Sequence, residues 1–137
     1  MKRDIPNFKV TDVGIAVVPR EGATDEEELW DTYLVNMKDH LLQSVLINSK
    51  GYGDVDGEKV KTSILRHFFD QIEPNSCTPI EPIQTKLFGL TNEYWISFSL
   101  PEDSYMYDKK YVFVKGSITE SNFTTIPYLN KKGVMIK

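Results

Sequence analysis

The sequence has a single cysteine, Cys77, so no intramolecular disulfide can form. One unpaired cysteine is typical of a reducing compartment. Long apolar runs are also missing. No stretch approaches the ~20 apolar residues of a membrane-spanning helix, and no apolar signal-peptide core follows the charged start MKRDIPNFKV. We therefore expect a cytoplasmic protein that has no membrane partner.

Clustered basic residues are scarce. The chain has 16 Lys and Arg against 20 Asp and Glu, which gives a net charge of −4. A nucleic-acid binder needs grouped Lys and Arg to neutralise phosphates, whereas here they are dispersed. We expect the one basic cluster, NKKGVMIK, to be solvated, and we expect no nucleic-acid partner.

The residues that are present describe one folded domain, since 137 residues with 40% hydrophobic content suffice for a core. The clearest structural signal is YWISFSLPEDSYMYDKKYVFV, where apolar and polar residues alternate on either side of a proline-led turn. This pattern predicts a β-hairpin. With a four-residue loop at 101–104, Trp95 faces Lys110 and Phe98 faces Tyr107 across the strands.

Other segments also favour strands. VTDVGIAVVPR predicts an opening strand that Pro19 ends, and YLVNMKDHLLQSVLINSK predicts a second hairpin that turns at 38–40. Three prolines exclude a helix in IEPNSCTPIEPI. Short strands separated by turns are typical of a mostly β protein, here an antiparallel two-sheet sandwich.

Two segments have helical features. Thr24 and Glu27 form a capping-box pattern ahead of LWDTYL, which favours a short helix there. In GEKVKTSILRHFFDQI the apolar residues would share one helical face, so an α+β fold with a helix at about 58–72 is the alternative. A turn at Pro-Asn-Ser just beyond favours a strand instead.

The segments YLVNMKDHLLQSVLINSKGYG, HFFDQIEPNSCTPIEPI and NEYWISFSL...KKYVFV give the chain a layout that resembles immunoglobulin-like and fibronectin-type-III-like domains. The whole chain also resembles small bacterial proteins from which no active site can be transferred. We divide it into an N-terminal tail (1–8), a β-sandwich domain (9–119) and a C-terminal segment (120–137). The last is too apolar for a free tail, so we expect it to dock on the domain or in a dimer contact.

The stretch SKGYGDVDGEKV combines three glycines with two aspartates. A calcium loop with Gly57 at its sixth position would place Tyr52 at the first and Ser63 at the twelfth, where ligands are required. The glycine spacing is one residue too long for a dinucleotide fingerprint. We predict a loop between strands with a turn at Asp56-Gly57, and the weak alternative is a metal site made of Asp54, Asp56 and Glu58.

No spacing typical of catalysis connects the two histidines and Cys77. We therefore predict no catalytic, cofactor-binding or metal-binding residues and no cofactor. The competing hypothesis is a small metal-assisted hydrolase that uses Asp54, Asp56, Glu58 and His67.

Aromatic residues of the late hairpin are the best candidates for binding, because Trp and Tyr supply contact area at low entropic cost. We predict a partner-contact patch of Trp95, Tyr105, Tyr107 and Lys110. The expected function is a non-catalytic protein-interaction or accessory module, with a protein partner or self-association. A carbohydrate-binding module is a further alternative, since exposed aromatic rings also bind sugars.

Overall fold

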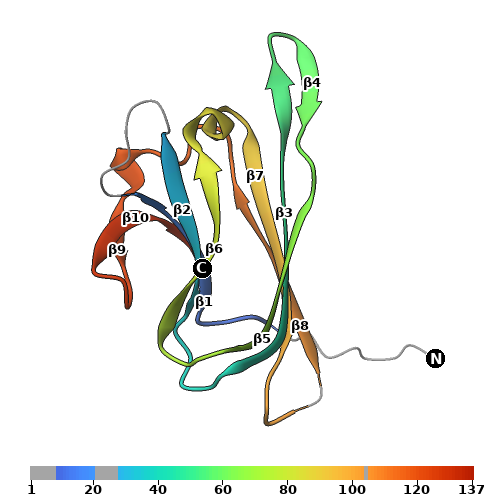
Figure 1. Cartoon of the computed structure of the whole chain (residues 1–137), viewed down its shortest axis with the longest axis vertical. Coiled ribbons are helices and arrows are strands. Elements are labelled where there is room, and N and C mark those ends of the chain that lie inside the picture. The colour runs from blue at the N-terminus through green and yellow to red at the C-terminus, as the bar shows by residue number, and fades with distance from the viewer. Residues whose placement is uncertain (1–8, 21–27, 104) are drawn as a thin grey trace, which may run out of the picture.

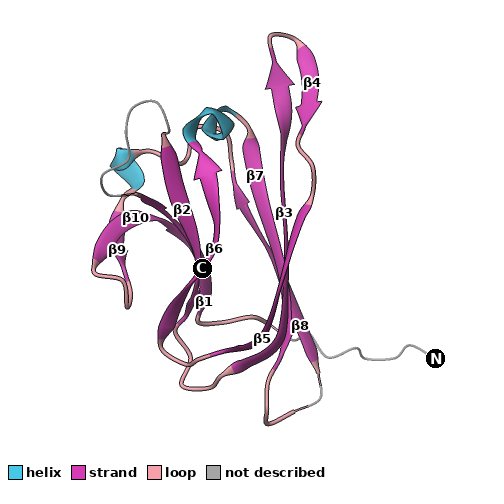
Figure 2. Cartoon of the chain, in the orientation of Figure 1, coloured by secondary structure: helices cyan, strands magenta, loops and turns pink. Residues whose placement is uncertain are grey.

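The computed structural model describes residues 9–20, 28–103 and 105–137. Within these ranges the chain forms two antiparallel sheets that pack face to face (Figures 1 and 2). The strands are β1 (Val13–Pro19), β2 (Leu29–Asn36), β3 (Leu42–Val55), β4 (Glu58–Lys61), β5 (Leu65–Ile72), β6 (Ser76–Gln84), β7 (Thr91–Ser99), β8 (Met106–Phe113), β9 (Thr124–Ile126) and β10 (Lys131–Ile136).

The first sheet has the order β6-β2-β1-β10-β9, and the second has the order β4-β3-β7-β8. Strand β5 pairs with residues 42–49 of β3, on the same side as β4, which pairs with residues 52–55. Figure 1 shows the first sheet on the left and the second on the right. One hydrophobic core lies between them. Its residues come from both sheets, including Ile15, Leu34, Ile47, Ile96 and Phe113. The predicted mostly β, two-sheet antiparallel sandwich is therefore confirmed.

Strand β1 lies in the middle of the first sheet and is buried on both faces. Its inward residues join the main core, while Ala16 and Val18 join a second cluster on the opposite face with Ile126. This double burial explains the continuous apolar run GIAVV. The close β1–β10 contact requires a residue without a side chain at Gly133, because a Cβ there would overlap the Val17 carbonyl oxygen.

The predicted late hairpin is confirmed as β7 and β8. Trp95 pairs with Lys110 and Phe98 with Tyr107, which is the register expected from a four-residue loop. The Phe98 and Tyr107 rings stack with centroids 5.5 Å apart. The predicted opening strand is also confirmed, and it ends at Pro19 as expected.

The second predicted hairpin is wrong, although both of its strands exist. Strand β2 pairs with β1 and β6, whereas β3 pairs with β4, β5 and β7 in the other sheet. The polar turn therefore carries the chain from one sheet to the other. A second connection, from β5 to β6, also crosses between the sheets.

Asn36 ties these two crossings together. Its side chain is fully buried and its Nδ2 donates to the carbonyl oxygens of His40 and Glu73, both at 3.0 Å. Its Oδ1 accepts a 3.0 Å hydrogen bond from the Lys38 backbone N–H. Both crossings thus depend on one buried amide.

The helical alternatives are also wrong where the structure describes them. Residues 58–72 form β4 and β5, with a break at 62–64 where the Thr62 hydroxyl accepts a 2.8 Å hydrogen bond from the Gly51 N–H. The break shifts the strand alternation and so imitates a helical period. Residues 29–34 belong to β2, while Thr24 and Glu27 lie outside the described residues.

Helical structure in the described part of the chain consists of two short 3₁₀ turns, at Thr85–Gly89 and Glu120–Asn122. No helix among these residues is long and apolar enough to cross a membrane. The C-terminal segment supplies β9 and β10, and β10 pairs along β1 inside the first sheet.

Candidate functional site

The glycine-rich stretch forms the β3–β4 hairpin, which projects at the top of Figure 1. Val55 pairs with Glu58, and Asp56 and Gly57 form the turn with φ values of 51° and 83°. The predicted Asp56-Gly57 turn is confirmed. Across the described ranges, no group of three or more His, Cys, Asp or Glu side chains is placed to hold a metal ion.

His67 lies far from this hairpin. It pairs with Ile47 on β3, seven residues before Asp54, which corresponds to roughly 23 Å along an extended strand. The structure therefore does not bring His67 together with the three acidic residues of the metal alternative.

The predicted contact patch is divided between the two faces of the second sheet. Trp95 and Lys110 lie together on its outer face, with Lys110 Nζ 5.1 Å from the Trp95 ring centroid. Tyr107 instead lies beside the buried Phe98 on the inner side, and its hydroxyl donates a 2.8 Å hydrogen bond to Asp103. Tyr105 is exposed near the turn.

Two residues that the sequence interpretation did not include complete the outer surface beside Trp95. Leu46 on β3 pairs directly with Phe68 on β5, and it also pairs with Ser97, two residues beyond Trp95 on β7. Leu46, Phe68 and Trp95 are 36%, 62% and 45% exposed. We call these three side chains, with the flanking Arg66 and Lys110, the outer patch.

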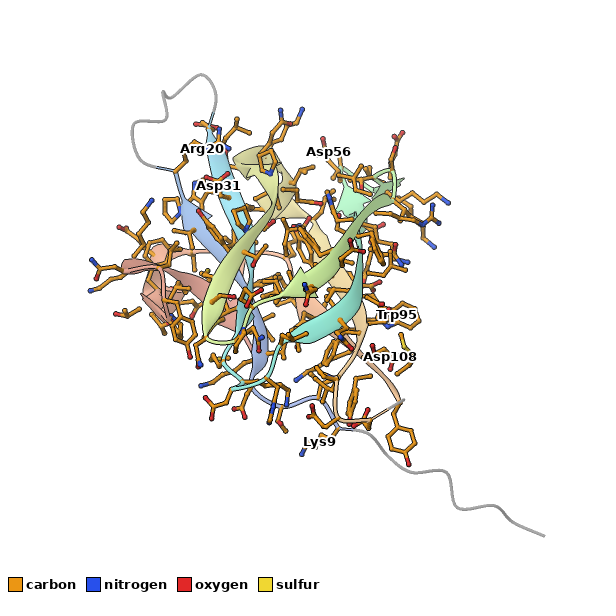
Figure 3. The ribbon with its side chains drawn as sticks, turned by 60° about the horizontal axis from the view of Figure 1, so that its bottom comes forward. Lys9, Arg20, Asp31, Asp56, Trp95 and Asp108 are labelled. Carbon is orange, nitrogen blue, oxygen red and sulfur yellow. The ribbon has the colours of Figure 1, made fainter. Side chains whose placement is uncertain are left out.

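A shallow hollow adjoins Trp95. Asn48, Trp95, Ser97 and Asp108 line it, and its volume is about 230 Å³. Trp95 and Asp108 lie near one another at the right of Figure 3. The Asn48 Oδ1 is buried and accepts no hydrogen bond from the described residues. The hollow thus combines an aromatic wall with three polar side chains.

A cavity of about 170 Å³ lies at the margin where β6 of the first sheet faces β3 and β5 of the second. Glu81 is one of its lining residues, and only 10% of that side chain is exposed. Three side chains of the second sheet contact it. His67 Nε2 lies 2.7 Å from Oε1, Ser49 Oγ donates at 2.9 Å, and the Tyr94 hydroxyl donates to Oε2 at 3.4 Å.

Glu81 points inward because of an irregularity in β6. The β2–β6 register shifts between Thr32 and Tyr33, and Thr32 pairs with Glu81 across it. The Thr32 hydroxyl donates to the Glu81 carbonyl at 2.8 Å and accepts from the Glu81 N–H at 3.2 Å. These bonds hold the Glu81 backbone, so its side chain takes a place that an apolar core residue would otherwise fill.

Glu81 and Glu93, the two most buried glutamates in the described part of the chain, have different partners. Glu93, with 8% of its side chain exposed, has Lys50 Nζ at 3.8 Å and Lys110 Nζ at 3.9 Å. Among the described residues, no Lys or Arg forms an ion pair with Glu81, and its contacts are a histidine and two neutral hydroxyls. Histidine is charged only when protonated. Glu81 therefore lacks the permanent positive partners that Glu93 has.

The cluster does not have the geometry of an activated nucleophile. A catalytic serine needs a base that contacts its hydroxyl, whereas Ser49 and His67 both contact Glu81. An ionised carboxylate only accepts hydrogen bonds, so when Glu81 is ionised the donor in the 2.7 Å contact is His67 Nε2. Burial, and secondarily the Glu81 charge, raise the pKa of Tyr94, which keeps its hydroxyl protonated as a donor. The arrangement can bind a ligand, and the observed contacts do not assemble a triad.

Cys77 takes no part in this cluster. Its side chain packs against the second hydrophobic cluster with Val35 and Ile126, and burial raises the pKa of its thiol to about 11. The sequence signal for the Glu81 cavity was a polar residue at an inward position of an alternating strand. Ser49 follows Val45 and Ile47 in this way, and His67 precedes Phe69.

Comparison with known proteins gives no further assignment, because no protein-family model, curated protein or solved structure matches the chain. The fold therefore assigns the protein only to a structural class, the antiparallel two-sheet β-sandwiches.

Proposed function

We propose that this protein is a non-catalytic interaction module that binds a protein partner through the outer patch. The observation that supports this proposal is the exposure of Leu46, Phe68 and Trp95 side by side on one sheet face. Contiguous apolar groups rimmed by polar residues mark interaction sites on soluble domains. Tryptophan and arginine are also the residues that most often dominate binding energy.

The outer patch has a defined shape before any partner binds. It lies on four paired strands, β5, β3, β7 and β8, and Lys110 stacks on the Trp95 ring. A surface built on strands loses little conformational entropy on binding. The flanking Arg66 favours a partner surface that is apolar at its centre and carries an acidic group at its rim, whereas Lys110 already lies 3.9 Å from the Glu93 carboxylate.

The test is affinity capture from the native host with the wild-type chain and a Phe68→Ser/Trp95→Ser variant. Tyr128→Ser is the matched control, because Tyr128 is 50% exposed and lies outside the outer patch. We expect a protein that the wild type and the control retain and that the double variant loses by tenfold or more. An identical set of proteins on all three baits, or turnover of a substrate with no partner, would contradict the proposal.

A sugar ligand is a second candidate, and the hollow beside Trp95 favours it. An indole wall next to Asn48, Ser97 and Asp108 offers a stacking face together with hydrogen-bonding groups, and the Asn48 Oδ1 has no partner among the described residues. Titration with monosaccharides and soluble polysaccharides, followed by tryptophan fluorescence, tests it. Asp108→Ala should remove any response, and a response that this variant retains would count against the hollow.

The proposal also covers the cellular location of the protein and the subtype of its β-sandwich. The site of action is the cytoplasm, supported by the single cysteine and by the absence of any long apolar stretch from the sequence. The layout is immunoglobulin-like or fibronectin-III-like, supported by two antiparallel sheets around one core. The net charge of −4 favours a partner other than nucleic acid.

A further inference from the structure

We propose that the Glu81 cavity binds a small organic ammonium group, with the Glu81 carboxylate as its counter-ion. This site is separate from the outer patch. It lies between the sheets, whereas the outer patch lies on the outer face of the second sheet. The ligand is a primary ammonium on a short alkyl chain.

The charge of the Glu81 carboxylate is not balanced by any Lys or Arg of the described residues. A buried carboxylate is stable when it is paired or fully hydrogen-bonded. Glu93 meets this condition with two lysines, but Glu81 has only His67 and two neutral hydroxyls. A carboxylate offers about four acceptor positions, and three side chains contact this one. Ser49 Oγ lies 2.9 and 3.1 Å from the two oxygens, but its hydroxyl has a single proton to donate. One position therefore remains for a donor that enters from the cavity, and a cationic donor also balances the charge.

The residues that line the cavity indicate the size and polarity of the uncharged part of the ligand. Apolar side chains of Leu65, Ile83 and Leu87 lie around the cavity, and its polar lining residues are Ser49, Lys50, Thr62, Ser63, Glu81, Asn92 and Tyr94. The Lys50 ammonium is paired with Glu93 at 3.8 Å. The cavity opens to solvent beside Leu65, which is 48% exposed, and its volume is about 170 Å³. A cavity of about 150 Å³ is enough to hold benzene, so this space admits a chain of four or five heavy atoms with one polar end. An apolar pocket with a few convergent polar groups is the usual form of a small-molecule site.

A metal ion fits this cavity poorly. Zinc and calcium sites require at least three or four protein ligands, and the described residues offer only Glu81 and His67 as strong ligands here. An anion is disfavoured by the carboxylate. An ammonium group needs only the charge and the hydrogen-bond acceptors that Glu81 and Ser49 supply.

The experiment uses n-butylammonium chloride as the probe, titrated into the ¹⁵N-labelled chain at constant ionic strength. The matched control ligand is n-butanol, which has the same chain and no charge. We expect n-butylammonium to bind at least tenfold more tightly than n-butanol, because a charge-assisted hydrogen bond adds to the apolar contact. The amide signals of Ser49, Glu81 and Leu87 should shift. Equal affinities, or shifts elsewhere, would overturn the proposal.

Two variants separate the role of charge from that of space. Glu81→Gln removes the charge and should lower n-butylammonium affinity at least tenfold while leaving n-butanol affinity unchanged. Leu65→Trp places a larger side chain beside the cavity and leaves Glu81 intact, so it keeps the test valid if Glu81→Gln does not fold. Its matched control is Val114→Trp, because Val114 is 58% exposed and belongs neither to the cavity nor to the outer patch. Wild-type n-butylammonium affinity in Glu81→Gln or in Leu65→Trp would refute the assignment.

An ammonium group can come from a free amine or from a lysine side chain of a partner. Nα-acetyl-lysine methylamide carries the same butylammonium group on a peptide backbone, so it distinguishes these sources. Binding of both probes assigns the site to a lysine side chain, whereas binding of n-butylammonium alone assigns it to a free amine. Failure of both probes refutes this inference and leaves the outer-patch proposal intact, since Phe68→Ser/Trp95→Ser does not touch the cavity.

Discussion

Replacing Asn36 with alanine should destabilise the fold far more than a typical asparagine substitution. The side chain is fully buried and makes three hydrogen bonds of 3.0 Å, two as donor and one as acceptor. All three partners are backbone groups of the crossings between the sheets. The substitution removes these bonds together and leaves two carbonyls and one N–H to find water.

The expected loss follows from the number of bonds. Each net hydrogen bond is worth about 1 kcal/mol, so three give about 3 kcal/mol, a large share of the stability of a small domain. Asn36→Asp keeps the acceptor oxygen but loses both donors and adds a buried charge. It should destabilise the domain at least as much.

Urea unfolding followed by circular dichroism measures the free energy of unfolding for each variant. The matched control is Asn122→Ala, because Asn122 is exposed and its side chain donates one 2.8 Å hydrogen bond to the Ser117 carbonyl. The control should lose less than about 1 kcal/mol. If Asn36→Ala loses no more than Asn122→Ala, with an unchanged slope, the crossings do not depend on Asn36.

Two further predictions concern other parts of the fold. Gly133→Ala should lower the free energy of unfolding by about 2 kcal/mol or more, measured by urea or thermal unfolding, because the added Cβ meets the backbone of the neighbouring strand. Gly89→Ala is the control, since a Cβ there meets no atom within 4 Å, and it should change the free energy of unfolding by no more than about 0.5 kcal/mol. Similar losses for both variants would contradict the close β1–β10 contact. Burial raises the pKa of Cys77 to about 11, so at pH 8 iodoacetamide should alkylate the folded chain on the order of 100-fold more slowly than the urea-unfolded chain. The folded rate should rise with pH up to about 11, and equal rates for both states at pH 8 would show an accessible thiolate.

The elements that sequence reasoning predicted well are those whose information is local. The β7–β8 register follows from the number of residues in one turn and from the alternation on either side of it, so Trp95 opposite Lys110 could be predicted. The Asp56-Gly57 turn is local in the same sense, since glycine favours the positive φ that the second turn position adopts.

The partner of each strand was harder to predict. A polar turn such as the one after Asn36 joins two strands in the same way whether they pair with each other or cross between sheets. The crossing differs from a hairpin in the hydrogen bonds of Asn36, whose side-chain amide binds the carbonyl oxygens of both the β2–β3 and the β5–β6 connections.

The Glu81 cavity was out of reach for the same reason. Its side chains come from β3, β5, β6 and β7, and their meeting depends on how two sheets face each other. Each residue alone reads as an ordinary polar substitution in a strand. The outer patch was half predicted, because Trp95 and Lys110 share a hairpin, while Leu46 and Phe68 belong to a different pair of strands.

The pairing of β10 with β1 has a consequence for synthesis. Strand β1 is translated well before β10, yet one of its two edges is completed only by residues 131–136. Until those residues leave the ribosome, the apolar strand GIAVV has an open edge that other chains can pair with. The first sheet therefore closes only after translation has passed β10. A chain that stops before residue 131 should aggregate rather than form a smaller stable sandwich.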